Sequence, residues 1–109
     1  MLFRSKDIII RGGENVPVVE IEQLLYKHPD IEDVAVIAIP DERLGERGCA
    51  VASLRAGATL DLAQMVGFLT DHGLTKNYLP ERLEIIGEFP RTPSGKIQKF
   101  KLRQIYGSS

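Results

Sequence analysis

The residues best suited to chemistry lie at positions 90–99, with the sequence Pro-Arg-Thr-Pro-Ser-Gly-Lys-Ile-Gln-Lys. Proline fixes φ and glycine accepts positive φ, so this stretch is predicted to form a shaped turn with Lys96 at its tip. A lysine held on such a loop is a mobile point charge that can contact phosphate or carboxylate. The alternative is a solvated surface lysine, which is the commoner situation, and the loop alone favours this alternative.

Charge is distributed unevenly along the 109 residues, although the net charge is only −1. Residues 90–109 contain five basic side chains and no acidic one, whereas residues 1–89 contain nine basic and 15 acidic side chains. A basic end on an acidic body indicates either a local surface that faces an anion or a solvated basic tail. The small net charge gives no global field that would favour nucleic acid or a membrane surface.

The other residues with reactive side chains do not form a self-contained catalytic set. His28 and His72 are each expected near a helix end, where a histidine more often bonds terminal carbonyls than acts as a metal ligand or base. Cys49 lies in an apolar run and is expected to be a buried small hydrophobe. A single thiol forms no disulfide framework, which favours a reducing cytosol. Gly95 and Lys96 lack the upstream glycine and the Ser or Thr of a phosphate loop, so a Walker A site is rejected.

The first elements that must position these residues form a strand, a turn and a helix within one domain. Residues 7–10 are mostly β-branched and predict a strand that leads into a tight hairpin at Gly12 and Gly13. The two glycines lack the full pattern of a dinucleotide-binding fingerprint. A helix is predicted from Pro17 to near His28, because apolar residues recur at helical spacing and proline is tolerated in a first helical turn.

The middle of the chain predicts two paired strands. Residues 34–39 are continuously apolar, which is typical of a strand covered on both faces, and residues 49–54 form a second apolar run. The charged loop between them is short, so the two strands are predicted to pair antiparallel.

The last part of the chain predicts two helices with a strand between them. Asp61 is a plausible N-cap, with Gln64 three residues later, for a helix that ends near His72. Residues 83–89 alternate and predict a strand with one wet face, and residues 100–106 predict a final helix whose apolar face includes Phe100. The order β-α-β-β-α-β-α, with an N-terminal β-hairpin, predicts an α+β fold: a small sandwich of helices on a mostly antiparallel sheet.

Motifs along nearly the whole chain resemble those of the adenylate-forming enzymes, which include acyl-CoA synthetases, firefly luciferases and peptide-synthetase adenylation domains. Residues 4–16, followed by residues 20–22, resemble the hinge and hairpin motif of this family, and residues 90–96 resemble the C-terminal motif with the catalytic lysine. Residues 40–47 and 78–81 resemble motifs that lie between these two, in the same order and at family spacing. By this resemblance, residues 1–109 are identified as the small, mobile C-terminal domain of such an enzyme, and the N-terminal adenylation domain is absent from the chain.

The resemblance implies a ligase that works in two steps. ATP and a carboxylic acid give acyl-AMP and pyrophosphate, and the thiol of coenzyme A then displaces AMP to give a thioester. Lys96 is implied as the catalytic residue of the first step, where its charge would meet the negative charge that gathers during adenylation. ATP, AMP and coenzyme A are implied as substrates or products, and Mg²⁺ is expected through ATP and the N-terminal domain. The C-terminal domain alone is expected to bind no cofactor or metal and to be inactive.

The resemblance also implies roles for residues near the N-terminus. Lys6 is implied as the hinge about which the small domain turns between two orientations, and Arg4 as a contact to the nucleotide ribose. Arg11, Gly12 and Gly13 match the hairpin that lines the pantetheine tunnel, where the absence of a side chain lets a thiol arm approach closely. Arg11 and the basic residues of the last helix either help to hold the phosphates of coenzyme A or are solvated charges.

The turn sequence Gly-Gly-Glu-Asn resembles most the acid–CoA ligases of the aryl, medium-chain or fatty-acid kind. Two alternatives stay open: a luciferase-like or carrier-protein-loading member of the same family, and a stand-alone basic module that binds nucleic acid or an acidic protein. The expected partners are the N-terminal domain, coenzyme A and a carboxylic acid. A cytoplasmic location is expected, since the sequence shows neither a signal peptide nor an apolar run long enough to span a bilayer.

Overall fold

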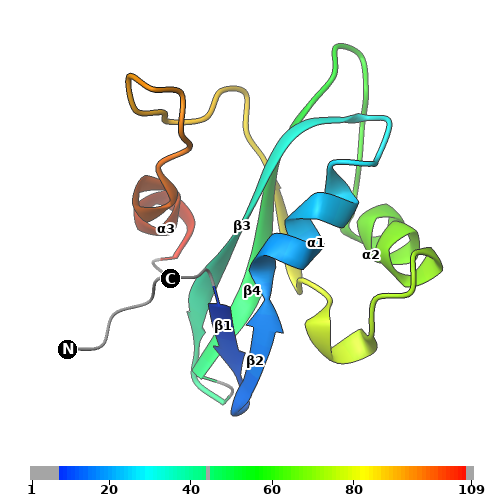
Figure 1. The fold of residues 1–109 in the computed structure, drawn as a ribbon, viewed down its shortest axis with the longest axis vertical. Helices are drawn as coiled ribbons and strands as arrows, with labels where there is room; N and C mark the ends of the chain where they lie inside the picture. The colour runs from blue at the N-terminus through cyan, green and yellow to red at the C-terminus, as the bar shows by residue number, and fades with distance from the viewer. Residues whose placement is uncertain (1–7, 44, 108–109) are drawn as a thin grey trace.

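The fold is that of a computed structural model, which describes residues 8–43 and 45–107 (Figure 1). Its elements, in chain order, are β1 (Ile8–Arg11), β2 (Glu14–Pro17), α1 (Val18–Leu25), β3 (Ile31–Asp41), β4 (Gly45–Leu54), α2 (Leu62–Asp71), the 3₁₀ helix η1 (Lys76–Tyr78), β5 (Arg82–Ile85) and α3 (Lys99–Tyr106). This order confirms the predicted α+β fold with an N-terminal hairpin. The longest of these helices has 10 residues, and none in the described part of the chain is long and apolar enough to cross a membrane.

The first two strands form the predicted tight hairpin. Arg11 pairs with Glu14 at the end of the ladder, and the two residues between them are Gly12, with φ of 58°, and Gly13, with φ of 86°. Two successive positive φ values define a type I′ turn, whose twist matches that of the flanking strands. Glycine adopts these values without steric cost, so the backbone alone fixes the shape of this turn.

The sheet has the order β2-β1-β4-β3, and β5 pairs with β4 outside this path. Strands β3 and β4 pair antiparallel from Ile31 opposite Leu54 to Asp41 opposite Gly45, which confirms the predicted pairing. Strand β5 instead runs parallel to β4, because α2 and η1 supply the crossover that a parallel pair needs. Most of the sheet is therefore antiparallel, as predicted, and β3 forms one of its edges.

Helices cover both faces of the sheet, with α1 and α2 on one side and α3 on the other (Figure 1). Val34 and Val36 of β3 point into the core under α1 and α2, whereas Ala35 and Ile37 point into the core under α3. This confirms that residues 34–39 form a strand buried on both faces. The two cores share β3 and β4, so each face of the molecule rests on the same pair of central strands.

The helix boundaries follow local chemistry, with one departure from expectation. Asp61 and Gln64 form the predicted capping box, since the Gln64 N–H donates to the Asp61 carboxylate at 2.8 Å and the Asp61 N–H donates to the Gln64 side chain at 3.0 Å. Helix α1 ends at Leu25, earlier than predicted, because the chain tightens there and the His28 N–H bonds the Leu25 carbonyl three residues back at 3.0 Å.

Two apolar segments near the end of the chain also differ from expectation. The strand predicted at residues 83–89 stops at Ile85, and the chain then leaves the sheet so that Phe89 packs into the core under α3. Phe100 was expected in the core, but its side chain is 51% exposed, and Ile105 is 56% exposed. Leu102, which is fully buried, carries the packing of α3 instead, so the buried stripe of this helix is narrower than its apolar pattern predicts.

Candidate functional site

The loop that carries Lys96 is closed by hydrogen bonds within itself. Arg91 and Ile97 face each other in an isolated antiparallel bridge. Between them, the Thr92 N–H donates to the Lys96 carbonyl at 2.8 Å, and the Gly95 N–H donates to the Thr92 carbonyl at 2.8 Å. The Lys96 N–H donates to the Thr92 hydroxyl oxygen at 3.1 Å, so one threonine holds both backbone groups of the lysine. Gly95, with φ of 92°, makes the turn possible and confirms the predicted shaped loop.

Two ion pairs connect this segment to the rest of the fold. Arg91 Nη2 lies 2.9 Å from Asp33 of β3, and Arg91 Nη1 donates to the Gly95 carbonyl at 2.8 Å. Lys99 Nζ, at the start of α3, lies 2.7 Å from Glu22 of α1. Two of the five cations of the basic end are therefore neutralised by the acidic body, which accounts physically for part of the charge asymmetry.

The side chain of Lys96 is exposed beside a shallow groove of about 380 Å³. The groove is lined by Thr92, Lys96, Ile97, Gln98, Lys99, Phe100 and Arg103. Within residues 8–43 and 45–107, no acidic side chain forms an ion pair with Lys96. The structure thus presents a lysine on an ordered backbone with its charge available to an external anion.

The hairpin forms a second surface with different chemistry. Gly12 and Gly13 are exposed, and a Cβ built at Gly13 would meet no other atom within 4 Å. Arg11 beside them is paired, since its Nε and Nη2 donate to the two carboxylate oxygens of Glu81 at 3.2 and 3.4 Å. The hairpin turn is therefore a smooth glycine surface flanked by a neutralised arginine.

The two surfaces lie apart. In Figure 1 the turn between β1 and β2 is at the bottom of the view, and the orange lysine loop before α3 is at the upper left. The structure therefore brings Arg11, Gly12 and Gly13 together, and places Lys96 in a separate site. Lys6 and Arg4, the predicted hinge and nucleotide contacts, lie outside the described residues.

The other sequence candidates do not join either surface. His72 Nδ1 lies 2.9 Å from the Phe68 carbonyl at the end of α2, which confirms the predicted role at a helix end. His28 Nδ1 accepts the Asp30 N–H at 3.1 Å, so it bonds an amide rather than a carbonyl. Cys49 is fully buried, and this burial raises the pKa of its thiol from 9.0 to about 11, as expected for a small hydrophobe.

The ion pairs that several residues make at these surfaces could not be predicted from the sequence. Asp33 and Glu22 looked like ordinary solvated acids, because their partners lie far along the chain in the basic end. Glu81 lies in the family-like motif at residues 78–81, but that motif did not predict its ion pair with Arg11. Thr92 could have been noticed, since a threonine four residues before a lysine in a proline- and glycine-rich turn is well placed to bond the backbone.

The sequence model of the AMP-binding enzyme C-terminal domain matches residues 20–96, which is most of the chain and ends at the candidate lysine. The chain belongs to the AMP-binding enzyme C-terminal domain family. The family match includes the Lys96 loop and β3 to β5, while the glycine hairpin lies just before it.

Similar proteins support this membership. The chain is 49% identical over 102 residues to a medium-chain fatty-acid–CoA ligase of Escherichia coli, covering 93% of the chain and 18% of that protein. It is 43% identical to the vibriobactin-specific 2,3-dihydroxybenzoate-AMP ligase of Vibrio cholerae, covering 93% of the chain and 19% of that protein. The solved structure of amide bond synthetase McbA from Marinactinospora thermotolerans superposes with a TM-score of 0.88 at 35% identity, covering 96% of the chain and 21% of that structure. This C-terminal domain therefore spans about a fifth of the length of these relatives.

Proposed function

We propose that the chain is the mobile C-terminal domain of an ATP-dependent carboxylic acid–CoA ligase that forms acyl-AMP and then a thioester. The observation that carries this proposal is the Lys96 loop, in which an exposed lysine stands on a hydrogen-bonded backbone at the end of the family match. The similarity to full-length ligases of which the chain covers 18% and 19% supports a larger enzyme with an N-terminal adenylation domain.

In the first step, a carboxylate oxygen of the acid attacks the α-phosphorus of ATP, and pyrophosphate leaves. Negative charge gathers between the carboxylate and the α-phosphate as this bond forms. The ammonium group of Lys96 would stabilise that charge, because a cation in an ordered, water-poor site stabilises a developing charge more than solvent does. The ordered backbone of the loop supports this role, since it fixes the point from which the lysine side chain would reach the reacting groups.

In the second step, the thiol of coenzyme A attacks the acyl carbonyl, the thiol proton leaves, and AMP departs from the thioester. The exposed Gly12 and Gly13 suit a wall along which the pantetheine arm would pass, because no side chain projects from them. The separation of this hairpin from the Lys96 loop supports a domain that turns between two orientations, with Lys6 as the proposed hinge and Arg4 as the proposed ribose contact.

The proposal has a specific alternative for the second step, in which a group other than coenzyme A would accept the acyl group. The names of the relatives include a CoA ligase, an acid–AMP ligase and an amide bond synthetase, so acid activation is common to them while the later product differs. A luciferase-like or carrier-protein-loading enzyme is the alternative. An assay with coenzyme A and a carrier-protein thiol side by side separates these acceptors.

The proposal is tested by grafting this chain in place of the matching C-terminal segment of the Escherichia coli relative, to which it is 49% identical. We expect Lys96→Ala to lower acyl-AMP formation by about 100- to 1000-fold, as removal of one charge-stabilising group does. Thioester formation from supplied acyl-AMP should stay within about twofold, because this step does not use the adenylation charge. The two half-reactions are measured separately, by pyrophosphate release and by thioester yield.

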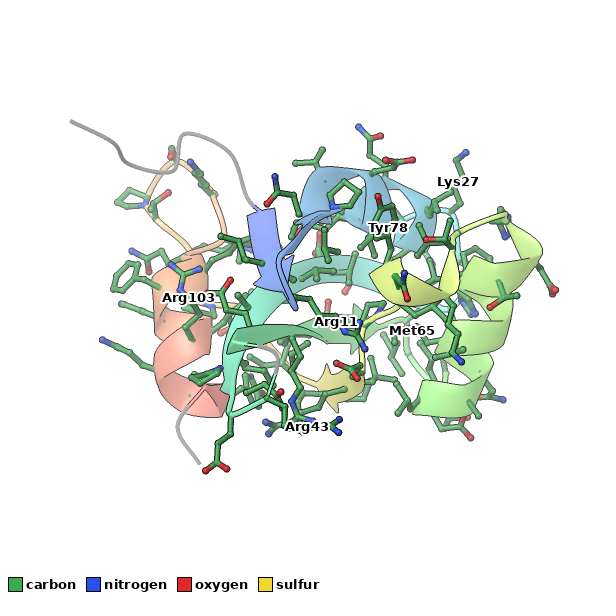
Figure 2. All side chains as sticks on the ribbon, turned by 90° about the horizontal axis from the view of Figure 1, so that it is seen from below. Arg11, Lys27, Arg43, Met65, Tyr78 and Arg103 are labelled. Atoms are coloured by element: carbon green, nitrogen blue, oxygen red, sulfur yellow. The ribbon has the colours of Figure 1, made fainter. Side chains whose placement is uncertain are left out.

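Lys27→Ala is the matched control, because Lys27 is an exposed lysine at the end of α1, across the view from α3 in Figure 2. It should leave both half-reactions unchanged. Equal loss of both half-reactions in Lys96→Ala would contradict the proposed role. The isolated 109-residue chain serves as the blank, and turnover of ATP by it would contradict the proposal that the acid and ATP sites lie in another domain.

A further inference from the structure

One end of the segment that carries Lys96 is fixed to an edge of the sheet by Arg91. The guanidinium of Arg91 bonds Asp33 of β3 through Nη2 at 2.9 Å and the Gly95 carbonyl through Nη1 at 2.8 Å. Because the guanidinium is planar and its donors point in fixed directions, these two bonds set the distance between the strand and the loop. The Gly95 carbonyl belongs to the peptide unit that leads directly into Lys96, so the arginine holds the backbone next to the lysine.

The other end of the same segment is fixed to the same edge. Lys99 Nζ lies 2.7 Å from a carboxylate oxygen of Glu22, and that oxygen also accepts the Val36 N–H at 2.8 Å. Since β3 is an edge strand, the Val36 N–H points away from the sheet and would otherwise lack a strand partner. The side chains of Lys99 and Glu22 are 18% and 16% exposed, so this ion pair is mostly buried and little contacted by water.

We propose that Asp33 and Glu22 are positioning residues for Lys96, which they hold through Arg91 before it and Lys99 after it. This inference rests on the proposed function of Lys96. Two acidic residues outside the basic end thus pair with Arg91 and Lys99, and Lys96 between them stays available for an anion. We call each of these ion pairs a tie. The uneven distribution of charge along the chain therefore helps to hold the lysine loop at the edge of the sheet.

The Asp33–Arg91 tie acts on the loop and contributes little to the stability of the fold. The two side chains are 33% and 38% exposed, and ion pairs this exposed contribute little to global stability. The loop itself has no buried apolar side chain between Arg91 and Lys96. Breaking the tie should therefore loosen the loop while β3, β4 and α3 stay packed, as local opening does in other proteins.

The experiment compares Arg91→Lys and Asp33→Asn with the matched control Arg55→Lys. Lysine keeps the charge at position 91 but cannot reach two acceptors with a planar fork, and asparagine keeps the shape at position 33 without its charge. The side chain of Arg55 makes one bond to a backbone carbonyl, that of Pro29, at 3.0 Å, and Arg55 lies outside the loop. An effect of altering any arginine-containing surface contact would appear in all three variants. An effect of breaking the Asp33–Arg91 ion pair would appear only in Arg91→Lys and Asp33→Asn.

The first measurement is amide hydrogen exchange of the 109-residue chain, followed by NMR. The Thr92, Gly95 and Lys96 N–H groups are all bonded within the loop. In Arg91→Lys and Asp33→Asn we expect these three amides to exchange roughly 10-fold faster, while amides of β4 keep their rates. Thermal unfolding should shift by about 4 °C or less.

The second measurement is acyl-AMP formation in the grafted ligase. We expect kcat to fall about 10-fold in both variants, with KM for ATP within about twofold. The reason is that a displaced Lys96 ammonium loses its interaction mainly with the transition state. Thioester formation from supplied acyl-AMP should be unchanged. Arg55→Lys should match the parent in exchange and in kcat.

Each other outcome overturns a defined part of the inference. Loop exchange and kcat equal to those of Arg55→Lys would overturn the tie itself. Faster exchange with a normal kcat, in a ligase that Lys96→Ala does impair, would overturn the positioning role. Faster exchange with a normal kcat in both Arg91→Lys and Lys96→Ala would overturn the proposed function of the lysine, while the structural tie would stand.

Discussion

The hairpin turn and the lysine loop are both short, exposed and glycine-containing, but side chains take part in shaping only one of them. The hairpin is shaped by its backbone, with positive φ at Gly12 and Gly13 and a regular ladder behind them. In the lysine loop only Gly95 has positive φ, and side-chain bonds from Thr92 and Arg91 are added to the backbone hydrogen bonds that close it. The hairpin should therefore tolerate changes of side chain around it, and the loop should not.

The two regions also treat their cations differently. Arg11 beside the hairpin is neutralised by Glu81, whereas Lys96 has no ion pair among residues 8–43 and 45–107. A surface that guides an uncharged arm needs shape, and a surface that meets a developing negative charge needs an available cation. The difference between the two surfaces therefore follows the difference between the two proposed steps.

The largest effect that separates the two regions is expected from Gly12→Asn in the grafted ligase. Asparagine tolerates the left-handed region, so the turn should persist with φ near 58°, but a side chain would now stand on the proposed tunnel wall. We expect thioester formation from supplied acyl-AMP to fall about 100-fold, since a displaced thiol loses its attack geometry. Acyl-AMP formation should stay within about twofold, the reverse of the pattern for Lys96→Ala.

The matched control for this variant is Gly57→Asn, because Gly57 also has a positive φ, of 79°, and open space around its Cβ position. It lies between β4 and α2, away from both surfaces. If Gly57→Asn lowered thioester formation as much as Gly12→Asn, the hairpin would have no special part in the second step.

A smaller effect, the pH dependence of stability, concerns both regions together, because Cys49 lies in the sheet that they share. Burial raises the pKa of Cys49 from 9.0 to about 11, so the folded chain keeps the thiol proton more tightly than the unfolded chain. The stabilisation is complete below pH 9 and is lost as the pH rises toward 11. We expect the free energy of unfolding to fall by about 1 kcal/mol between pH 8 and pH 10, measured by urea titration.

Cys49→Ala should remove most of this slope between pH 8 and pH 10. Tyr26 and Tyr106, whose pKa values are raised above 10.0 mainly by burial, begin to add a slope of the same sign as the pH approaches 10. Probes in the hairpin and in α3 should report one transition, since Cys49 lies on the central strand β4. Separate transitions for the two regions would show that their cores unfold independently.

Local patterns predicted most of the fold. The hairpin followed from Gly12 and Gly13, the capping box from Asp61 and Gln64, and the antiparallel pair β3–β4 from two apolar runs with a short loop. Each of these features is decided by residues within a few positions of one another. The shaped turn at Lys96 was predictable for the same reason.

Features that depend on contacts between distant residues were not predictable. The Asp33–Arg91 pair joins positions 58 apart, and nothing near Asp33 marks it as a partner of the loop. The exposure of Phe100 depends on how α3 sits over the sheet, where Leu102 already fills the space. The parallel direction of β5 depends on the path of α2 and η1, which periodicity does not describe.

The smallest effect tests whether the side chains really shape the lysine loop. Thr92→Val keeps the size and branching of the side chain but removes the hydroxyl that accepts the Lys96 N–H at 3.1 Å. One such bond contributes about 1 kcal/mol, so the Lys96 amide should exchange roughly fivefold faster, and acyl-AMP formation should fall by a similar factor. Thr59→Val, at an exposed threonine before α2, should change neither quantity. The amide of Gly13 should keep its rate in both variants, because the hairpin is held by its backbone. If the Lys96 amide were unaffected in Thr92→Val, the Thr92 hydroxyl would have no part in the shape of the loop, and the contrast with the hairpin would weaken.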